Sequence, residues 1–190
     1  MADRSRLDSP IGPLDLSVED GVLVEVSLVA DDRGPRGAPD GRRPGSRAEA
    51  ARLARLEAAR AADVAPARGA IAERIAAYFD GALDALDDVP VAPRGTEFQR
   101  RVWLALRAIP AGQTRSYGQL AAEVASPAAV RAVGAANGAN PIPLVLPCHR
   151  VIASTGALHG YGLGLWRKEW LLRHEGFLAP ELPGLSRGGT

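Results

Sequence analysis

A proline-rich segment, residues 140–150 (NPIPLVLPCHR), constrains the folding of this 190-residue chain more than any other stretch. Its prolines lack a backbone N–H donor and fix φ at about −65°, which excludes a helix interior or an inner strand. Asn140, directly before Pro141, can bond nearby backbone and fix a turn. We therefore predict an extended loop that ends at Cys148 and His149.

Cys148 is the only cysteine of the chain, so an internal disulfide is excluded and a cysteine-based zinc site is disfavoured. A lone cysteine is usually a small buried hydrophobe, and it becomes a nucleophile where a base or a positive charge favours its thiolate. His149 is the candidate base, directly or through a water. Glu175 could orient the imidazole, as in other nucleophile–base–orienter sets.

The first half of the chain predicts a β-hairpin followed by helices. Apolar residues alternate over 14–18 and again over 22–28, and Asp20-Gly21 between them is a typical two-residue turn. Three further segments follow by composition and periodicity: a mobile loop at 31–47, a helix at 48–62, and a helix with an apolar stripe from Ile71 to Phe79 that Gly81 stops.

The second half predicts short helices with clear end signals. These are a helix capped by Thr96 and Gln99 that ends before Pro110, a helix from the cap Ser116 through Val124, a helix opened by Ser126 and Pro127, and a last helix from Trp166 to Glu175 closed by Gly176. The middle two resemble a helix-turn-helix. Val151-Ile152 and the Thr155-Gly156 turn predict a small hairpin or wing.

Together these elements predict an α+β fold with two domains and a tail. Residues 1–93 would form a small, variable N-terminal α/β domain with an antiparallel hairpin. Residues 94–176 would form a mostly helical, winged-helix-like domain, and residues 177–190 a tail. No apolar run reaches the roughly 18 residues of a membrane helix, and the N-terminus lacks the apolar region of a secretory signal, so we expect a cytoplasmic protein without membrane contact.

Charge is distributed unevenly between the halves, although the net charge is only +1. Residues 94–175 carry a balance of +6, and residues 1–93 a balance of −5. A basic second half is typical of a module that binds a polyanion such as nucleic acid. Solvated helix faces and chance would give the same imbalance.

Several residues outside the Cys-His pair have both a structural and a functional interpretation. The helix opened by Pro127 consists mostly of small residues, so it could enter a groove with Arg131 projecting, or pack tightly against a neighbouring helix. Tyr117 and Tyr161 could be core aromatics, or could bond to or stack on an extruded base. The glycines at 160, 162 and 164 could admit a planar ligand or form a flexible loop.

Taken together, these residues resemble the O6-alkylguanine-DNA alkyltransferase family. The resemblance covers roughly residues 95–176, through GTEFQRRVW, IPAGQTRSYGQLA, RAVGAANGANPIP, LPCHRVI, and GYGLG followed by KEWLLRHEG. The order and spacing of these motifs are highly specific. The N-terminal segments SPIGPL and AAYFDG resemble the family's variable domain more weakly, and residues 31–62 resemble an insertion.

The resemblance implies a role for each matching residue. Cys148 resembles the alkyl acceptor, and His149 and Glu175 resemble the base and its orienter, with a water between thiol and imidazole. Asn140 resembles the hinge between the recognition helix and the active-site loop. Arg131 resembles the finger that fills the base stack after the damaged nucleotide has left it, with the recognition helix in the minor groove.

Further positions would form the base pocket. Tyr117 resembles the residue that helps rotate the nucleotide and donates toward the guanine ring. Tyr161 would line the pocket, and the carbonyls of Cys148 and Val151 would accept from the guanine amino group. Gly162 stands where some relatives have serine, which leaves only a backbone donor to O6. Some relatives bind zinc in the N-terminal domain; with one cysteine, we expect no such metal site.

The implied function is direct-reversal DNA repair. The chain would act as a methylated-DNA–protein-cysteine S-methyltransferase that takes the alkyl group of O6-alkylguanine, and of O4-alkylthymine as a further possible substrate, once and irreversibly. The expected partner is double-stranded DNA, bound by a monomer that uses no cofactor. Two alternatives are a non-catalytic protein that recognises alkylated DNA, against which Cys148 argues, and an unrelated Cys-His hydrolase, which leaves Arg131 unexplained.

Overall fold

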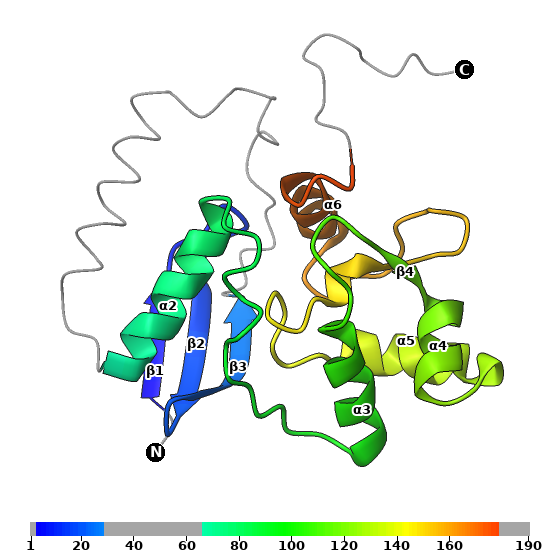
Figure 1. Cartoon of the computed structure of the whole chain (residues 1–190), viewed down its shortest axis with the longest axis horizontal. Helices are drawn as coiled ribbons and strands as arrows, with labels where there is room; N and C mark the ends of the chain where they lie inside the picture. Colours follow the sequence, from blue (N-terminus) through cyan, green and yellow to red (C-terminus); the bar gives the residue numbers. More distant parts are fainter. Residues whose placement is uncertain (1–2, 29–65, 179–190) are drawn as a thin grey trace, which may run out of the picture.

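The computed structural model describes residues 3–28 and 66–178 (Figure 1). The predicted loop at 31–47, the predicted helix at 48–62 and most of the predicted tail lie outside the described residues. The order of elements and the buried core reproduce the predicted α+β fold.

The N-terminal half is built on a three-stranded antiparallel sheet in the order β1-β2-β3. Its strands are β1 (Asp3–Leu7), β2 (Leu14–Glu19) and β3 (Val22–Leu28). The predicted hairpin is confirmed, and both turn residues have positive φ (Asp20 49°, Gly21 79°), as a type I′ turn requires. We did not predict β1, because DRSRL contains a single apolar residue and therefore has no alternating pattern.

Helix α2 (Pro66–Phe79) packs against this sheet (Figure 1). Its stripe Ile71, Ile75 and Tyr78 is buried, as the periodicity predicts. The helix ends ahead of Gly81, whose φ of 108° suits a residue without Cβ.

The C-terminal half consists of short helices and one two-stranded sheet. In chain order the elements are α3 (Glu97–Leu106), β4 (Arg115–Ser116), α4 (Tyr117–Val124), η1 (Pro127–Ala129), α5 (Val130–Gly138), η2 (Cys148–Arg150), β5 (Val151–Ile152) and α6 (Leu165–His174). Full capping boxes begin α3 and α4, at Thr96 and Ser116. Helices α4 and α5 pack against each other as the predicted helix-turn-helix.

Two local expectations for this half need correction. Ser126 makes no side-chain cap, and Pro127 begins a 3₁₀ turn that leads into α5 rather than α5 itself. Strand β5 pairs in parallel with β4 instead of forming a hairpin with a later strand. The expected turn nevertheless exists, since Gly156 has a φ of 81° and its N–H bonds to the carbonyl of Ala153. The pairing with β4 could not be predicted from a local pattern, because β4 is far from β5 in the sequence.

One core runs through both halves and fixes their relative position. In the C-terminal half Trp103 of α3 is buried, and its indole N–H donates to the carbonyl of Ala136 in α5 at 2.7 Å. The sheet joins the proline-rich loop through Val26 N–H and the carbonyl of Pro141, at 2.8 Å. Among the described helices, none has the length and apolar character needed to cross a membrane.

Candidate active site

The proline-rich loop is buried along almost its whole length, which is unusual for a loop. Its prolines carry no N–H to satisfy, and Asn140 satisfies two further backbone groups. Asn140 Nδ2 donates to the carbonyl of Leu146 at 2.6 Å, and Oδ1 accepts from Ile142 N–H at 3.0 Å. The predicted turn role of Asn140 is thereby confirmed. Leu144 has a φ of 76°, which is strained for a residue with a side chain.

Cys148 lies at the end of this loop, 5% exposed, in the wall of a small open pocket. Residues of α5, the proline-rich loop and the glycine-containing loop before α6 line this pocket: Asn137, Gly138, Asn140, Pro143, Cys148, Gly160, Tyr161, Gly162 and Leu163. The structure thus brings together five of the residues singled out from the sequence: Asn140, Cys148, Gly160, Tyr161 and Gly162. The buried Asn137 side chain donates to the carbonyl of Cys148 at 3.3 Å and holds the backbone at the thiol.

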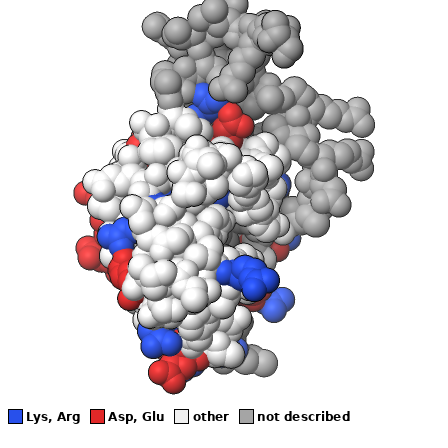
Figure 2. All heavy atoms as spheres, turned by 90° about the vertical axis from the view of Figure 1, so that its right-hand side faces the viewer, with Lys and Arg blue, Asp and Glu red and all other residues white. Residues whose placement is uncertain are grey.

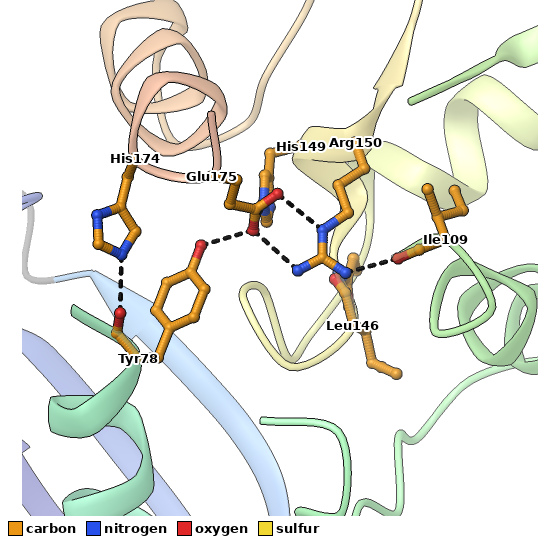
Figure 3. A network of polar contacts seen from close by, with 8 residues as sticks. Tyr78, Ile109, Leu146, His149, Arg150, His174 and Glu175 are labelled. Carbon is orange, nitrogen blue, oxygen red and sulfur yellow. Dashed lines mark hydrogen bonds and ion pairs between the residues drawn. The ribbon is translucent and has the colours of Figure 1, made fainter. Parts of the chain in front are cut away.

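A buried polar cluster surrounds Glu175 and includes His149, the residue that follows Cys148 in the chain (Figure 3). Glu175 Oε1 contacts His149 Nε2 at 2.9 Å, Arg150 Nη2 at 2.8 Å and the Tyr78 hydroxyl at 2.7 Å. Its Oε2 accepts from Arg150 Nε at 2.9 Å, and Arg150 Nη1 donates to the carbonyl of Ile109 at 2.6 Å. The predicted meeting of His149 and Glu175 is therefore present, although 26 positions separate them.

The charges of this cluster fix the tautomer of His149. Burial alone would raise the pKa of Glu175, but the hydrogen bonds and charges of His149 and Arg150 hold it well below its usual range, so the carboxylate is ionised. Burial lowers the pKa of His149 despite the pull of Glu175, which keeps the imidazole neutral. A neutral His149 must donate from Nε2 to Glu175, which leaves the lone pair on Nδ1. Within the described residues, Nδ1 is buried and has no hydrogen-bond partner.

Burial also raises the pKa of Cys148, while the polar side chains of Asn140 and Tyr161 and the charge of Lys168 oppose that rise. Lys168 is itself fully buried, and burial lowers its pKa to about 8. Its ammonium donates to the carbonyl of Val151 at 2.7 Å and of His159 at 3.3 Å. The resting thiol is therefore protonated at neutral pH, beside a lysine that remains mostly charged.

The remaining candidate residues differ in whether they line the pocket. Tyr161 lines the pocket, and its buried hydroxyl has no hydrogen-bond partner in the described part of the chain. Tyr117 begins α4; burial first, and then the charge of Cys148, raise its pKa. Arg131 is exposed near the start of α5 and does not line the pocket. Gly162 faces α5, where a Cβ would lie 3.4 Å from the carbonyl of Gly138.

The sequence patterns did not identify four residues whose side chains bond to groups of the site: Tyr78, Asn137, Arg150 and Lys168. Arg150 was signalled by its place in the tripeptide CHR, and Lys168 by being the one lysine of the chain. Tyr78 gave no signal beyond its place on an apolar stripe, since its partner Glu175 lies 97 positions away. Across residues 3–28 and 66–178, no group of three or more His, Cys, Asp or Glu side chains is arranged to hold a metal ion.

The surface near α4 is less basic than the charge balance suggested. Figure 2 shows that end of the molecule as mostly uncharged, with separate basic and acidic groups rather than one continuous basic patch. Arg100, Arg101 and Arg131 are exposed. The balance of +6 by itself therefore does not identify a binding face.

Comparison with known sequences gives consistent matches. The family described as 6-O-methylguanine DNA methyltransferase, DNA binding domain, matches residues 97–177. A methylated-DNA–protein-cysteine methyltransferase of Salmonella typhimurium is 60% identical over 110 residues, which are 58% of this chain and 64% of that protein. The same enzyme of Mycolicibacterium paratuberculosis is 44% identical over 175 residues, 92% of this chain and 93% of that protein. The match thus spans under two thirds of the Salmonella protein but nearly all of the mycobacterial one.

Solved structures agree with these sequence matches. The O6-methylguanine methyltransferase of Mycobacterium tuberculosis is 38% identical with a TM-score of 0.69, covering 92% of this chain and 93% of its own. A structure of M. tuberculosis OGT in complex with DNA gives a TM-score of 0.67 at 37% identity, covering 93% and 94%. An archaeal enzyme from Pyrococcus kodakaraensis, 23% identical with a TM-score of 0.53, shares the fold.

Proposed function

Because this chain belongs to the methylated-DNA–protein-cysteine methyltransferase family, we propose that it repairs DNA by transferring the alkyl group of O6-alkylguanine to Cys148. The observation that carries the proposal is the juxtaposition of a buried thiol in a pocket wall with a neutral, Glu175-oriented His149. Nucleophile, base and orienter are the three parts that such a transfer requires.

The reaction proceeds by displacement at the alkyl carbon. His149 Nδ1 takes the thiol proton, directly or through a water, and the resulting imidazolium is stabilised by Glu175. The thiolate forms a new S–C bond while the C–O6 bond breaks, and the electron pair of that bond passes into the purine. The base then takes up a proton and becomes guanine. The S–C bond of the product thioether is not readily broken, because the Cys148 thiolate would have to leave, so each chain reacts once.

Burial keeps the thiol protonated in the resting protein, so the reactive thiolate forms only during transfer to the substrate. Because burial raises the pKa of Cys148, the thiolate does not accumulate in the resting protein. The charge of Lys168 and the nearby hydroxyl of Tyr161 stabilise the thiolate at the moment of transfer. The thiol is therefore protected until a substrate arrives, which matters for a residue that is consumed by a single event.

The alkyl carbon lies inside the duplex, so the proposal includes rotation of the damaged nucleotide into the pocket. Arg131 enters the base stack in its place, Tyr117 assists the rotation, and Tyr161 lines the bound base. The carbonyls of Cys148 and Val151 accept from the guanine amino group, and Gly162 offers a backbone donor to O6. O4-alkylthymine, which carries an alkyl group on an exocyclic oxygen, is a second substrate in this proposal.

Repair of a duplex containing one O6-methylguanine tests the proposal. The wild-type chain should restore guanine, and Cys148→Ala should restore none while it still binds the duplex. Asn137→Ala is a useful comparison, because it loosens the Cys148 backbone without removing the thiol. Repair by Cys148→Ala, or tight binding without repair by the wild type, would overturn the proposal.

A further inference from the structure

Glu175 is shared among more donors than the orientation of a histidine requires. Oε1 alone contacts His149, Arg150 and Tyr78, and Oε2 accepts a second bond from Arg150 (Figure 3). Of these donors, Tyr78 is the one from the N-terminal half, contributed by α2. Its ring is fully buried, and the mechanism above does not use it.

The Tyr78 hydroxyl is held firmly in this position. His174 Nε2 contacts the backbone carbonyl of Tyr78 at 2.7 Å, and the Tyr78 ring packs edge-on against His174 and Phe79, with centroid distances of 5.1 and 5.3 Å. The backbone and the ring of Tyr78 are therefore both anchored, and the hydroxyl points at the carboxylate of Glu175 at 2.7 Å.

Each hydrogen bond that a carboxylate accepts weakens its attraction for the protons of its other partners. A buried carboxylate that contacted only the imidazole would favour the imidazolium, and a protonated histidine cannot accept the thiol proton. Arg150 and Tyr78 distribute the negative charge of Glu175 over further N–H and O–H donors. Both therefore keep His149 neutral and available as a base, and Tyr78 does so without adding charge.

We propose that Tyr78 is a positioning residue that sets the proton affinity of His149 through Glu175, so that the N-terminal half tunes the base of the alkyl transfer. This inference rests on the proposed function. The other charged and titratable groups around His149 are Glu175, Arg150, Lys168 and Cys148, and each remains when the Tyr78 hydroxyl is removed.

The sign of the effect follows from the contacts. Tyr78→Phe removes one donor from Oε1, so the carboxylate attracts the His149 proton more strongly and the pKa of His149 rises. Less neutral His149 is then present at low pH, and the acid limb of the rate profile moves to higher pH. A net hydrogen bond of ordinary strength corresponds to a shift of roughly half a pH unit, or about a threefold loss of rate on that limb.

The test measures single-turnover transfer from an O6-methylguanine duplex against pH for the full-length wild type, Tyr78→Phe and the control Phe79→Leu. Phe79 contacts the same ring but makes no bond to Glu175. NMR titration of the imidazole gives the pKa of His149 directly, and is simple because the chain has three histidines. We expect both the acid limb and the His149 titration to move upward in Tyr78→Phe and to stay in place in Phe79→Leu.

A second variant keeps the packing intact and reverses the sign. Placing 3-fluorotyrosine at position 78 makes the hydroxyl a stronger donor, so the acid limb and the His149 titration should move to lower pH. Unmoved titrations in both Tyr78 variants, or a rate loss that is equal at every pH, would overturn the inference. Absence of any transfer by the wild type would instead contradict the proposed function, while the titration would still test the role of Tyr78.

Discussion

The two halves of the molecule bury different kinds of side chain. In the described N-terminal half the core is aliphatic and aromatic, as at Leu16 and Ile75, and its buried polar residues are the two serines at 9 and 17. The C-terminal half buries charged and polar groups: Asn137, His149, Arg150, Lys168 and Glu175. Buried charges stabilise a fold poorly, since desolvation offsets their attraction. Under the proposed function, the chemistry of the site rather than stability accounts for their presence in the C-terminal half.

The two halves nevertheless contact each other at the buried polar cluster around Glu175. Tyr78 reaches Glu175 from α2, and Arg167 Nε of α6 donates to the carbonyl of Ile11 at 2.7 Å. The comparison therefore assigns a largely apolar core to the first half, the buried polar cluster to the second, and adjustment of that cluster to the contact between them. Substitutions in each half test this assignment.

The largest effect should come from Glu175→Ala. It leaves the Arg150 guanidinium buried without its carboxylate, which costs about 3–5 kcal/mol in the free energy of unfolding, and it removes the orienter of His149. Urea unfolding and single-turnover transfer measure the two losses. Glu169→Ala is the matched control, because Glu169 forms a partly exposed i,i+4 pair with Arg173, and such pairs are worth less than about 1 kcal/mol. Similar losses in both variants would contradict the special role of the buried cluster.

Leu16→Ala should separate stability from reactivity. Leu16 is fully buried in β2, so the truncation should cost about 2–5 kcal/mol in the free energy of unfolding. The single-turnover rate constant, which does not depend on the folded fraction, should stay unchanged under conditions where the protein folds. A large fall in that constant would show that the sheet does more than stabilise.

Acid should destabilise the molecule through the C-terminal half. The pKa of Glu175 is lower in the folded chain than its usual 4.5, so its stabilisation is complete above that value and is lost as the pH falls below it. The hydrogen bond and charge of Arg6 also lower the pKa of Asp15, but both side chains are exposed and contribute little. The midpoint of urea unfolding should depend less on pH in Glu175→Gln than in the wild type. In Arg6→Gln the dependence on pH should equal that of the wild type. The reverse pattern would place the acid sensitivity in the sheet.

Arg131→Ala tests reactivity that depends on the duplex. If Arg131 occupies the place of the rotated nucleotide, its loss should slow repair of duplex DNA by roughly tenfold and leave reaction with free O6-benzylguanine nearly unchanged. Rate constants for both substrates give the ratio. Equal losses on the two substrates would mean that Arg131 supports the pocket rather than the stack.

The smallest effect should come from a helix cap. Thr96→Ala removes the capping box of α3 and should lower the free energy of unfolding by about 1 kcal/mol. Transfer should be unaffected, because Thr96 caps the first turn of α3 and does not line the pocket. Thermal unfolding together with a transfer assay checks both statements, and a slowed transfer would show that α3 orients the active-site loop.

Local patterns in the sequence predicted what depends on neighbouring residues. The Asp20-Gly21 turn, the Thr96–Gln99 capping box, the Ser116 cap and the Asn140 turn are all short-range, and all are present. The pairing of β5 with β4 and the contact of Tyr78 with Glu175 depend on chain segments far apart, so no local signal revealed them. The meeting of Cys148, His149 and Glu175 was anticipated through the family resemblance, since spacing alone cannot bring position 175 to 149.

Stoichiometric transfer to Cys148 is the central claim, and intact mass spectrometry with peptide mapping tests it most directly. After incubation with excess O6-methylguanine duplex, the chain should gain the mass of one methylene, located on Cys148, and the guanine restored should equal the protein present. Restored guanine in excess of protein, or a methyl group on any other residue, would contradict the account.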